Sequence, residues 1–169
     1  VPEVFKQKHR YCLAIHSFET LVQKSDTPRE LGLFQHLFLK NVSDRGRFQA
    51  LLRPDHNMDI IQGPSETREP DAALLGNFYE TRNGIEIAAR VVDIKTGEIL
   101  AIKDTYTETK DQEALKSAAQ NLAEKFHRAF PLTDARITGI TQGNLIITPE
   151  NNKKKKIRIK WPLIIYRKD

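Results

Sequence analysis

The sequence contains a single cysteine, Cys12, a single methionine and a single tryptophan in 169 residues. One cysteine excludes an internal disulfide and a Cys-x-x-Cys metal motif, and its apolar neighbours favour a buried small side chain. No apolar run approaches the roughly 20 residues that a membrane-spanning helix needs. The first ten residues also lack the apolar stretch of a signal peptide, so either none exists or it precedes residue 1.

Sequence motifs of catalysis are missing as well. There is no glycine-rich nucleotide loop, nucleophile elbow or zinc-protease helix, and the five histidines lack metal-pair spacing. His16 and Ser17 are adjacent in a predicted strand, so their side chains should point to opposite faces. We therefore expect no catalytic residue, no cofactor, no metal and no enzymatic activity. An enzyme remains an alternative if His56 and Asp59 face one another in a cleft.

The positive charge is concentrated at the carboxy-terminal end. Residues 151–169 hold eight Lys or Arg side chains and one acid, whereas the other 150 residues hold 19 basic and 21 acidic ones. Such a cluster predicts either a solvated hairpin tip that protects strand edges or contacts with nucleic-acid phosphates. We favour the tip, and nucleic-acid binding is the alternative function. The basic residues concerned are Lys153, Lys154, Lys155, Lys156, Arg158 and Lys160.

Hydrophobic periodicity predicts a strand, a helix and a second strand in the first third of the chain. Residues 10–18 form an apolar run that is typical of a strand buried on both faces. A helix should begin at Thr27-Pro28 and end by Gly46, with a second strand at 47–54. This order implies a right-handed crossover between two parallel strands. Residues 54–70, rich in Pro, Gly and charge, form a long connection that is either functional or mobile.

A three-stranded meander and a second helix are predicted next. The strands cover about 71–81, 84–94 and 98–108, joined by a two-residue Asn83-Gly84 turn and by a turn in which Gly97 takes positive φ. Asp93 should bond to the amides of the second turn. One face of the middle strand is apolar, whereas the other mixes charged and small residues and should be only partly covered. Thr109 and Gln112 should cap a helix that ends before Pro131.

These elements predict the fold class. We expect an α/β domain over residues 1–131, with a mixed sheet of about five strands and both helices packed on one face. A small all-β appendage, SH3-like or a hairpin, should follow over residues 132–169. Leu13 and Ile15 of the first strand should share one core with Leu122 and Phe126 of the last helix.

The meander also resembles a family of bacterial envelope proteins. Leu75-Gly76, Arg90-Val91-Val92-Asp93 and Thr96-Gly97-Glu98-Ile99 fit a pattern shared by the curli-secretion CsgG proteins, the TolB amino-terminal domain and the FlgT middle domain. The segment from Phe126 to Thr148 resembles the start of the FlgT carboxy-terminal domain. The resemblance implies a non-catalytic periplasmic or outer-membrane-associated protein of a Gram-negative bacterium.

The expected function is therefore that of a scaffold or adaptor that binds protein partners in envelope assembly, secretion or flagellar structure. It allows a homo-oligomer and a lipid anchor outside this chain. The expected contacts are the partly covered meander face, the basic residues above, and the apolar side chains of the long connection, Met58, Ile60 and Ile61.

Overall fold

The computed structural model describes residues 11–20, 27–44, 46–53, 69–130 and 135–149. The chain divides into two compact units. The described elements of the first unit run from strand β1 to helix α3, and those of the second are strands β6 and β7. The predicted domain boundary at residue 131 stays a prediction.

The first unit is built on a five-stranded mixed sheet in the order β2-β1-β3-β4-β5. Its strands are β1 (Tyr11–His16), β2 (Phe48–Arg53), β3 (Ala72–Glu80), β4 (Ile85–Asp93) and β5 (Ile99–Thr107). Strand β1 pairs in parallel with both β2 and β3, whereas β3 with β4 and β4 with β5 are antiparallel. The predicted parallel pair and the predicted meander are both confirmed.

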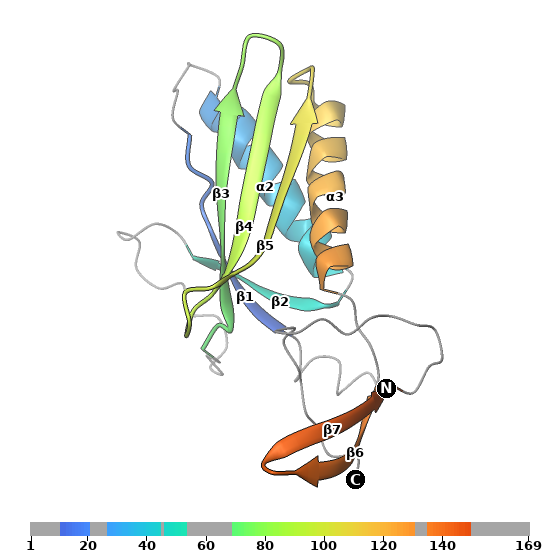
Figure 1. Ribbon diagram of the computed structural model, residues 1–169. Coiled ribbons are helices and arrows are strands. Elements are labelled where there is room, and N and C mark those ends of the chain that lie inside the picture. The colour runs from blue at the N-terminus through green and yellow to red at the C-terminus, as the bar shows by residue number, and fades with distance from the viewer. Residues whose placement is uncertain (1–10, 21–26, 45, 54–68, 131–134, 150–169) are drawn as a thin grey trace. The chain divides into compact units, whose positions relative to one another are not determined.

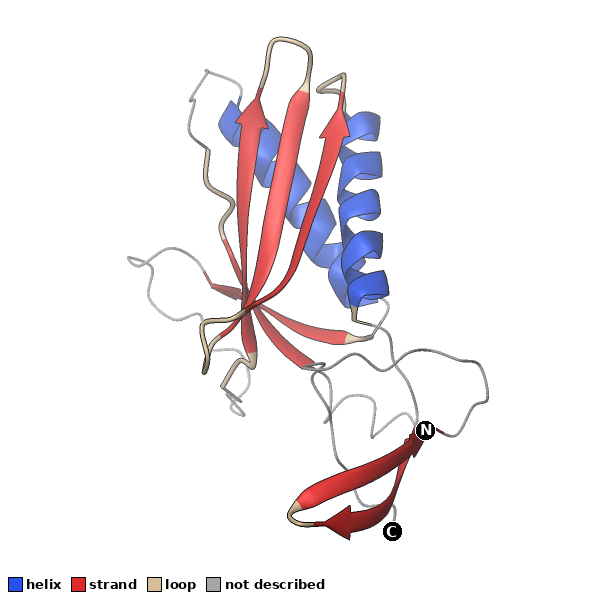
Figure 2. Ribbon diagram, in the orientation of Figure 1, coloured by secondary structure: helices blue, strands red, loops and turns tan. Residues whose placement is uncertain are grey.

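Two helices, α2 (Thr27–Asp44) and α3 (Gln112–Ala129), cover the same face of this sheet (Figure 1). Figure 2 shows this two-layer arrangement, with α2 passing behind the three strands of the meander and α3 alongside β5. The predicted fold class, a five-stranded mixed sheet with two helices and a small β appendage, is therefore confirmed. Leu13, Ile15, Leu122 and Phe126 are all fully buried.

The core between the helices and the sheet contains a cluster of phenylalanine rings among aliphatic side chains. Phe34 and Phe38 of α2 stack at 5.9 Å, and the Phe18 ring meets both of them edge-on at 5.4 and 5.6 Å. Phe126 of α3 contacts Phe38 at 6.3 Å. Edge-to-face contacts at these distances stabilise a core beyond the area that they bury.

Phe18 is fixed because the chain after β1 continues to bond to β3. The Glu19 amide donates to the Gly76 carbonyl, and the Phe78 amide donates to the Glu19 carbonyl, both at 2.8 Å. The Phe18 ring then lies directly on Gly76, where an added Cβ would approach ring carbons to 2.2 Å. Glycine is therefore required at position 76 for close approach of the ring.

The predicted cap of the second helix was wrong by two residues. The side chain that accepts from the first turn is that of Asp111, whose Oδ1 receives the Ala114 amide at 2.9 Å. Thr109 instead donates its hydroxyl to Asp111 Oδ2 at 2.6 Å. A carboxylate before the first helical residue satisfies the free amides and also suits the positive end of the helix, so Asp111 displaces threonine as the cap.

The predicted two-residue Asn83-Gly84 turn was also wrong. Glu80 pairs with Ile85, so the connection has four residues, and the Thr81 amide donates to the Gly84 carbonyl at 2.8 Å. Asn83 does not take the positive φ that a type I′ turn requires. Gly84, at φ 154°, lies so close to β5 that a Cβ would meet the Thr107 carbonyl oxygen at 2.1 Å.

The second unit holds a hairpin of β6 (Ala135–Thr141) and β7 (Asn144–Pro149). Gln142 and Gly143 both have positive φ, at 50° and 79°, which is the geometry of a type I′ turn. The hairpin confirms that the appendage contains β-structure. The rest of the predicted appendage, from residue 150 onward, lies outside the described residues.

Candidate partner-binding surface

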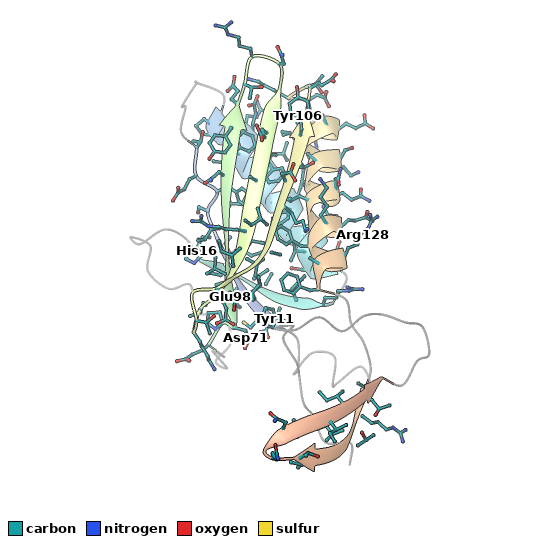
Figure 3. The ribbon with its side chains drawn as sticks, viewed as in Figure 1. Tyr11, His16, Asp71, Glu98, Tyr106 and Arg128 are labelled. Carbon is teal, nitrogen blue, oxygen red and sulfur yellow. The ribbon has the colours of Figure 1, made fainter. Side chains whose placement is uncertain are left out.

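The side of the meander that faces away from both helices is the candidate functional surface. It is turned toward the viewer in Figure 3, where Tyr106 is labelled on it. Side chains alternate along a strand, so the pairing register assigns every second residue to this side. We define the open face as Ala73, Leu75, Asn77, Tyr79, Glu86, Ala88, Arg90, Val92, Ile99, Ile102, Asp104 and Tyr106.

The register arranges the open face in four rows that run across β3, β4 and β5. Tyr79, Glu86 and Tyr106 form the first row. The second row is Asn77, Ala88 and Asp104, the third is Leu75, Arg90 and Ile102, and the fourth is Ala73, Val92 and Ile99. Apolar side chains therefore dominate the third and fourth rows and flank Glu86 in the first.

Strand β5 exposes several large apolar side chains to solvent. Ile102 is 60% exposed, and Ile99 and Tyr106 are each 50% exposed. Single exposed apolar residues are ordinary on a protein surface, but a contiguous group rimmed by polar residues is typical of an interaction site. Here the three side chains lie on one face, and Leu75 and Val92, both half-buried, share the rows of Ile102 and Ile99 respectively.

The turn between β4 and β5 holds these rows in register. The Lys95 and Thr96 amides both donate to Asp93 Oδ1 at 2.9 Å, and the Gly97 amide donates to the Asp93 carbonyl at 2.9 Å. The hydrogen bonds to Oδ1, above all the one from the Thr96 amide, lower the pKa of the Asp93 carboxyl below its ordinary value of 3.8. Gly97 takes a φ of 71°, which confirms the predicted turn.

The opposite end of the meander is fixed by Tyr106. Its hydroxyl donates to the Asn83 carbonyl at 2.7 Å, which joins the end of β5 to the connection between β3 and β4. Lys110 adds an ion pair to Glu80, whose side chain is almost fully buried. Both ends of the three-stranded surface are therefore tied by bonds within the chain.

The outer edge of β5 is protected against strand addition. Lys125 of α3 donates from Nζ to the Asp104 carbonyl at 2.6 Å, and it lies 4.0 Å from the carboxylate of the same residue. A lysine on an edge carbonyl blocks pairing with another strand. A partner of this region would therefore contact the open face rather than extend the sheet from β5.

Two charges lie on the central strand of the open face. Glu86 and Arg90 are both exposed, and neither forms an ion pair within the described residues. Their cross-strand neighbours are uncharged. Glu86 lies between Tyr79 and Tyr106, and Arg90 lies between Leu75 and Ile102. The surface thus combines apolar area with one free charge of each sign.

A second group of ionisable residues lies where β1 begins. The Cys12 amide donates to Asp71 Oδ2 at 2.8 Å, and the Asp71 amide returns a bond to the Cys12 carbonyl at 2.8 Å. Burial, with smaller contributions from the charges of Asp93 and Asp71, raises the pKa of the Tyr11 hydroxyl to about 12. A phenol with this pKa stays protonated at neutral pH, and the carboxylates here serve backbone bonding.

Within the described ranges, no group of three or more His, Cys, Asp or Glu side chains could hold a metal ion. No helix among the described elements is long and apolar enough to cross a membrane. Cys12 is fully buried, as predicted.

The predicted contact residues divide into two groups. Met58, Ile60 and Ile61 of the long connection lie outside the described residues, as do Lys153, Lys154, Lys155, Lys156, Arg158 and Lys160. The meander face was predicted from the alternation along β4 and is described: Glu86 and Arg90 are exposed, and Ala88 and Val92 are half-buried. The side chains of β5 were not singled out, although Ile102, Asp104 and Tyr106 show the same two-residue alternation.

No protein-family model matches the chain, and no curated protein matches it. Similar solved structures include a PelC dodecamer from Paraburkholderia phytofirmans, at 12% identity and a TM-score of 0.48, covering 72% of this chain and 89% of that one. TolB from Acinetobacter baumannii has 12% identity and a TM-score of 0.45, and the match covers 77% of this chain and 30% of TolB. The protein XCC0632 from Xanthomonas campestris has 9% identity and a TM-score of 0.46, and the match covers 71% of this chain and 86% of XCC0632.

These solved structures are of bacterial envelope proteins. At such identities and TM-scores the likeness carries no argument about the activity or partners of this chain.

Proposed function

We propose that this chain is a non-enzymatic scaffold or adaptor that binds protein partners through the open face. The observation that carries the proposal is the exposure of Ile99, Ile102 and Tyr106 together on one side of β5, with Leu75 in the row of Ile102 and Val92 in the row of Ile99. Burying such side chains against a partner removes apolar area from water, which is the main driving force of protein association.

The way in which the surface is built supports binding rather than chemistry. Its two ends are tied by the Asp93 turn and by the bond from Tyr106 to Asn83, so a partner would meet a preformed surface. The nearby carboxylates are engaged in folding: Asp93 receives loop amides, Asp111 caps α3, and Asp71 receives the Cys12 amide. Their roles are accounted for without a substrate.

We place this scaffold in the periplasm or at the outer membrane of a Gram-negative bacterium, in envelope assembly, secretion or flagellar structure. The resemblance of Leu75-Gly76, Arg90–Asp93 and Thr96–Ile99 to envelope proteins supports the location. In this chain those residues serve identifiable purposes: Gly76 admits the Phe18 ring, and Asp93 with Gly97 forms the turn that sets the register of the open face.

The proposal is tested by photo-crosslinking in cells. A photoreactive amino acid replaces Ile102 on the open face in one variant and Lys116, an exposed residue of α3, in the control. We expect adducts from position 102 only, in the envelope fraction. Equal adducts from both positions, or none from position 102, would argue against the open face as a binding surface, and recovery in the cytosol would contradict the location.

A further inference from the structure

The charges on the open face are placed so that they complement a second copy of the same face. Glu86 and Arg90 lie four residues apart on β4, which separates their Cα atoms by about 13 Å at the usual rise of a strand. They are therefore too far apart to pair within one chain. Between them lies the row of Asn77, Ala88 and Asp104, whose central side chain is a single methyl group.

A two-fold axis along this middle row brings complementary groups together. Rotation by 180° about this axis produces a second copy whose open face lies opposite the first. The second rows of the two copies then face each other, and the first row of each copy faces the third row of the other. Glu86 of one copy then faces Arg90 of the other, and the reverse pair forms at the same time. An interface of this kind is isologous, which is the commonest symmetry of soluble homo-oligomers.

The apolar side chains match under the same rotation. Tyr106 of one copy lies over Ile102 of the other, and Tyr79 lies over Leu75. Two sheets that pack face to face lie about 10 Å apart, so side chains of this size from the two faces interdigitate. The small Ala88 lies at the centre, where the two copies of β4 approach each other.

Other positions of the axis do not give this match. An axis along the third row places Arg90 against its own copy, and an axis along the first row does the same for Glu86; like charges in contact oppose association. An axis between the second and third rows sets Arg90 over Ala88 and leaves both charges unpaired. The axis along the middle row does place the two Asp104 side chains opposite each other at the rim of the interface. Each of them is 74% exposed and lies 4.0 Å from Lys125 Nζ, so solvent and the lysine reduce their repulsion.

From this self-complementarity we infer that the partner of the open face is a second copy of this chain, packed face to face about the row of Ala88. The inference rests on the proposed function, because it names the partner of the same surface.

The test uses charge reversal and recombination in the full chain. Sedimentation velocity over a concentration series should give the wild type twice the chain mass of 19.4 kDa. Glu86→Arg and Arg90→Glu should each weaken self-association by about tenfold or more, since each homodimer then holds two like-charge contacts. Mixing the two variants should restore a dimer, because the arginine introduced in one variant then faces the glutamate introduced in the other. Far-UV circular dichroism verifies that each variant is folded.

Lys116→Glu, an equal charge reversal on α3, is the control and should leave the dimer unchanged. The inference is overturned if the single variants associate as strongly as wild type, or if mixing them restores nothing. A wild-type monomer at every concentration also overturns it. In that case, adducts from position 102 to a different protein would leave the proposed function standing, whereas the absence of such adducts would refute both.

Discussion

The contact between Phe18 and Gly76 gives a prediction whose sign can be worked out from the structure. In an ordinary strand, Gly→Ala should stabilise a protein by about 0.5–1 kcal/mol, because alanine loses less backbone entropy on folding. At Gly76 the new methyl group would lie 2.2 Å from a ring carbon of Phe18. That ring is itself buried against Phe34 and Phe38, so moving it away from the methyl group would disturb both ring contacts.

We therefore expect Gly76→Ala to destabilise the first unit by about 1–3 kcal/mol, the usual cost of overpacking a core. At an m-value of about 2 kcal/mol per M, the midpoint of urea unfolding should fall by roughly 0.5–1.5 M. Unfolding is followed by far-UV circular dichroism. Gly32→Ala in α2 is the matched control: nothing lies within 4 Å of its new Cβ, so it should stabilise by up to about 1 kcal/mol.

A double-mutant cycle isolates the contact. Phe18→Ala removes all the ring carbons that lie on Gly76, at a cost of about 3–5 kcal/mol. In that background Gly76→Ala should be neutral or stabilising, which means a coupling of about 1 kcal/mol or more between the two positions. Strict additivity, or a stabilising effect of Gly76→Ala in the wild type, would refute the close approach of the ring and the backbone.

Three further predictions concern the fold and its ionisable groups. Leu122→Asp should unfold the first unit, because it buries an unpaired charge; wild-type thermal stability in that variant would contradict the packing of α3. Asp111→Ala should lower the thermal midpoint more than Thr109→Ala, since only Asp111 accepts a helix amide, and equal effects would return the cap to threonine. The Tyr11 hydroxyl has a folded pKa of about 12, above its ordinary value of 10.0, so its contribution to stability is complete below pH 10 and is lost as pH rises toward 12. The loss of stability between pH 10 and 12 should be smaller in Tyr11→Phe, and unchanged alkaline unfolding would show that Tyr11 is not the group responsible.

The order of the strands and helices followed from the sequence because the helices have one apolar stripe, the first strand is a continuous apolar run, and the meander strands are bounded by turn residues. The Asp93–Glu98 turn was predictable from its residue types. An aspartate at its start accepts the loop amides, and a glycine four residues later takes the positive φ. The two errors arose where local signals competed. Asp111 was overlooked because Thr109 and Gln112 fit a capping pattern. The Asn83-Gly84 pair does not form a two-residue turn, because Gly84 instead packs closely against the end of β5.

The open face could be predicted only in part. The alternation along β4 indicated a partly covered side, but only the register shows that Leu75 and Ile102 flank Arg90, and that Tyr79 and Tyr106 flank Glu86. The protection of the β5 edge by Lys125 depends on where α3 lies against the sheet, which periodicity does not determine. The other predicted contacts, at Met58, Ile60 and Ile61 and within residues 153–160, lie outside the described residues and stay predictions.

The most direct test of the central claim is whether the open face is covered in the cell. The only cysteine, Cys12, is fully buried, so an engineered surface thiol gives a clean signal. Ile102→Cys and the control Lys116→Cys are labelled with a maleimide, both in intact envelopes and as dilute purified protein. The account predicts that envelopes slow the labelling of the thiol at position 102 severalfold and leave that at position 116 unchanged. Equal labelling rates at position 102 in both settings would contradict it.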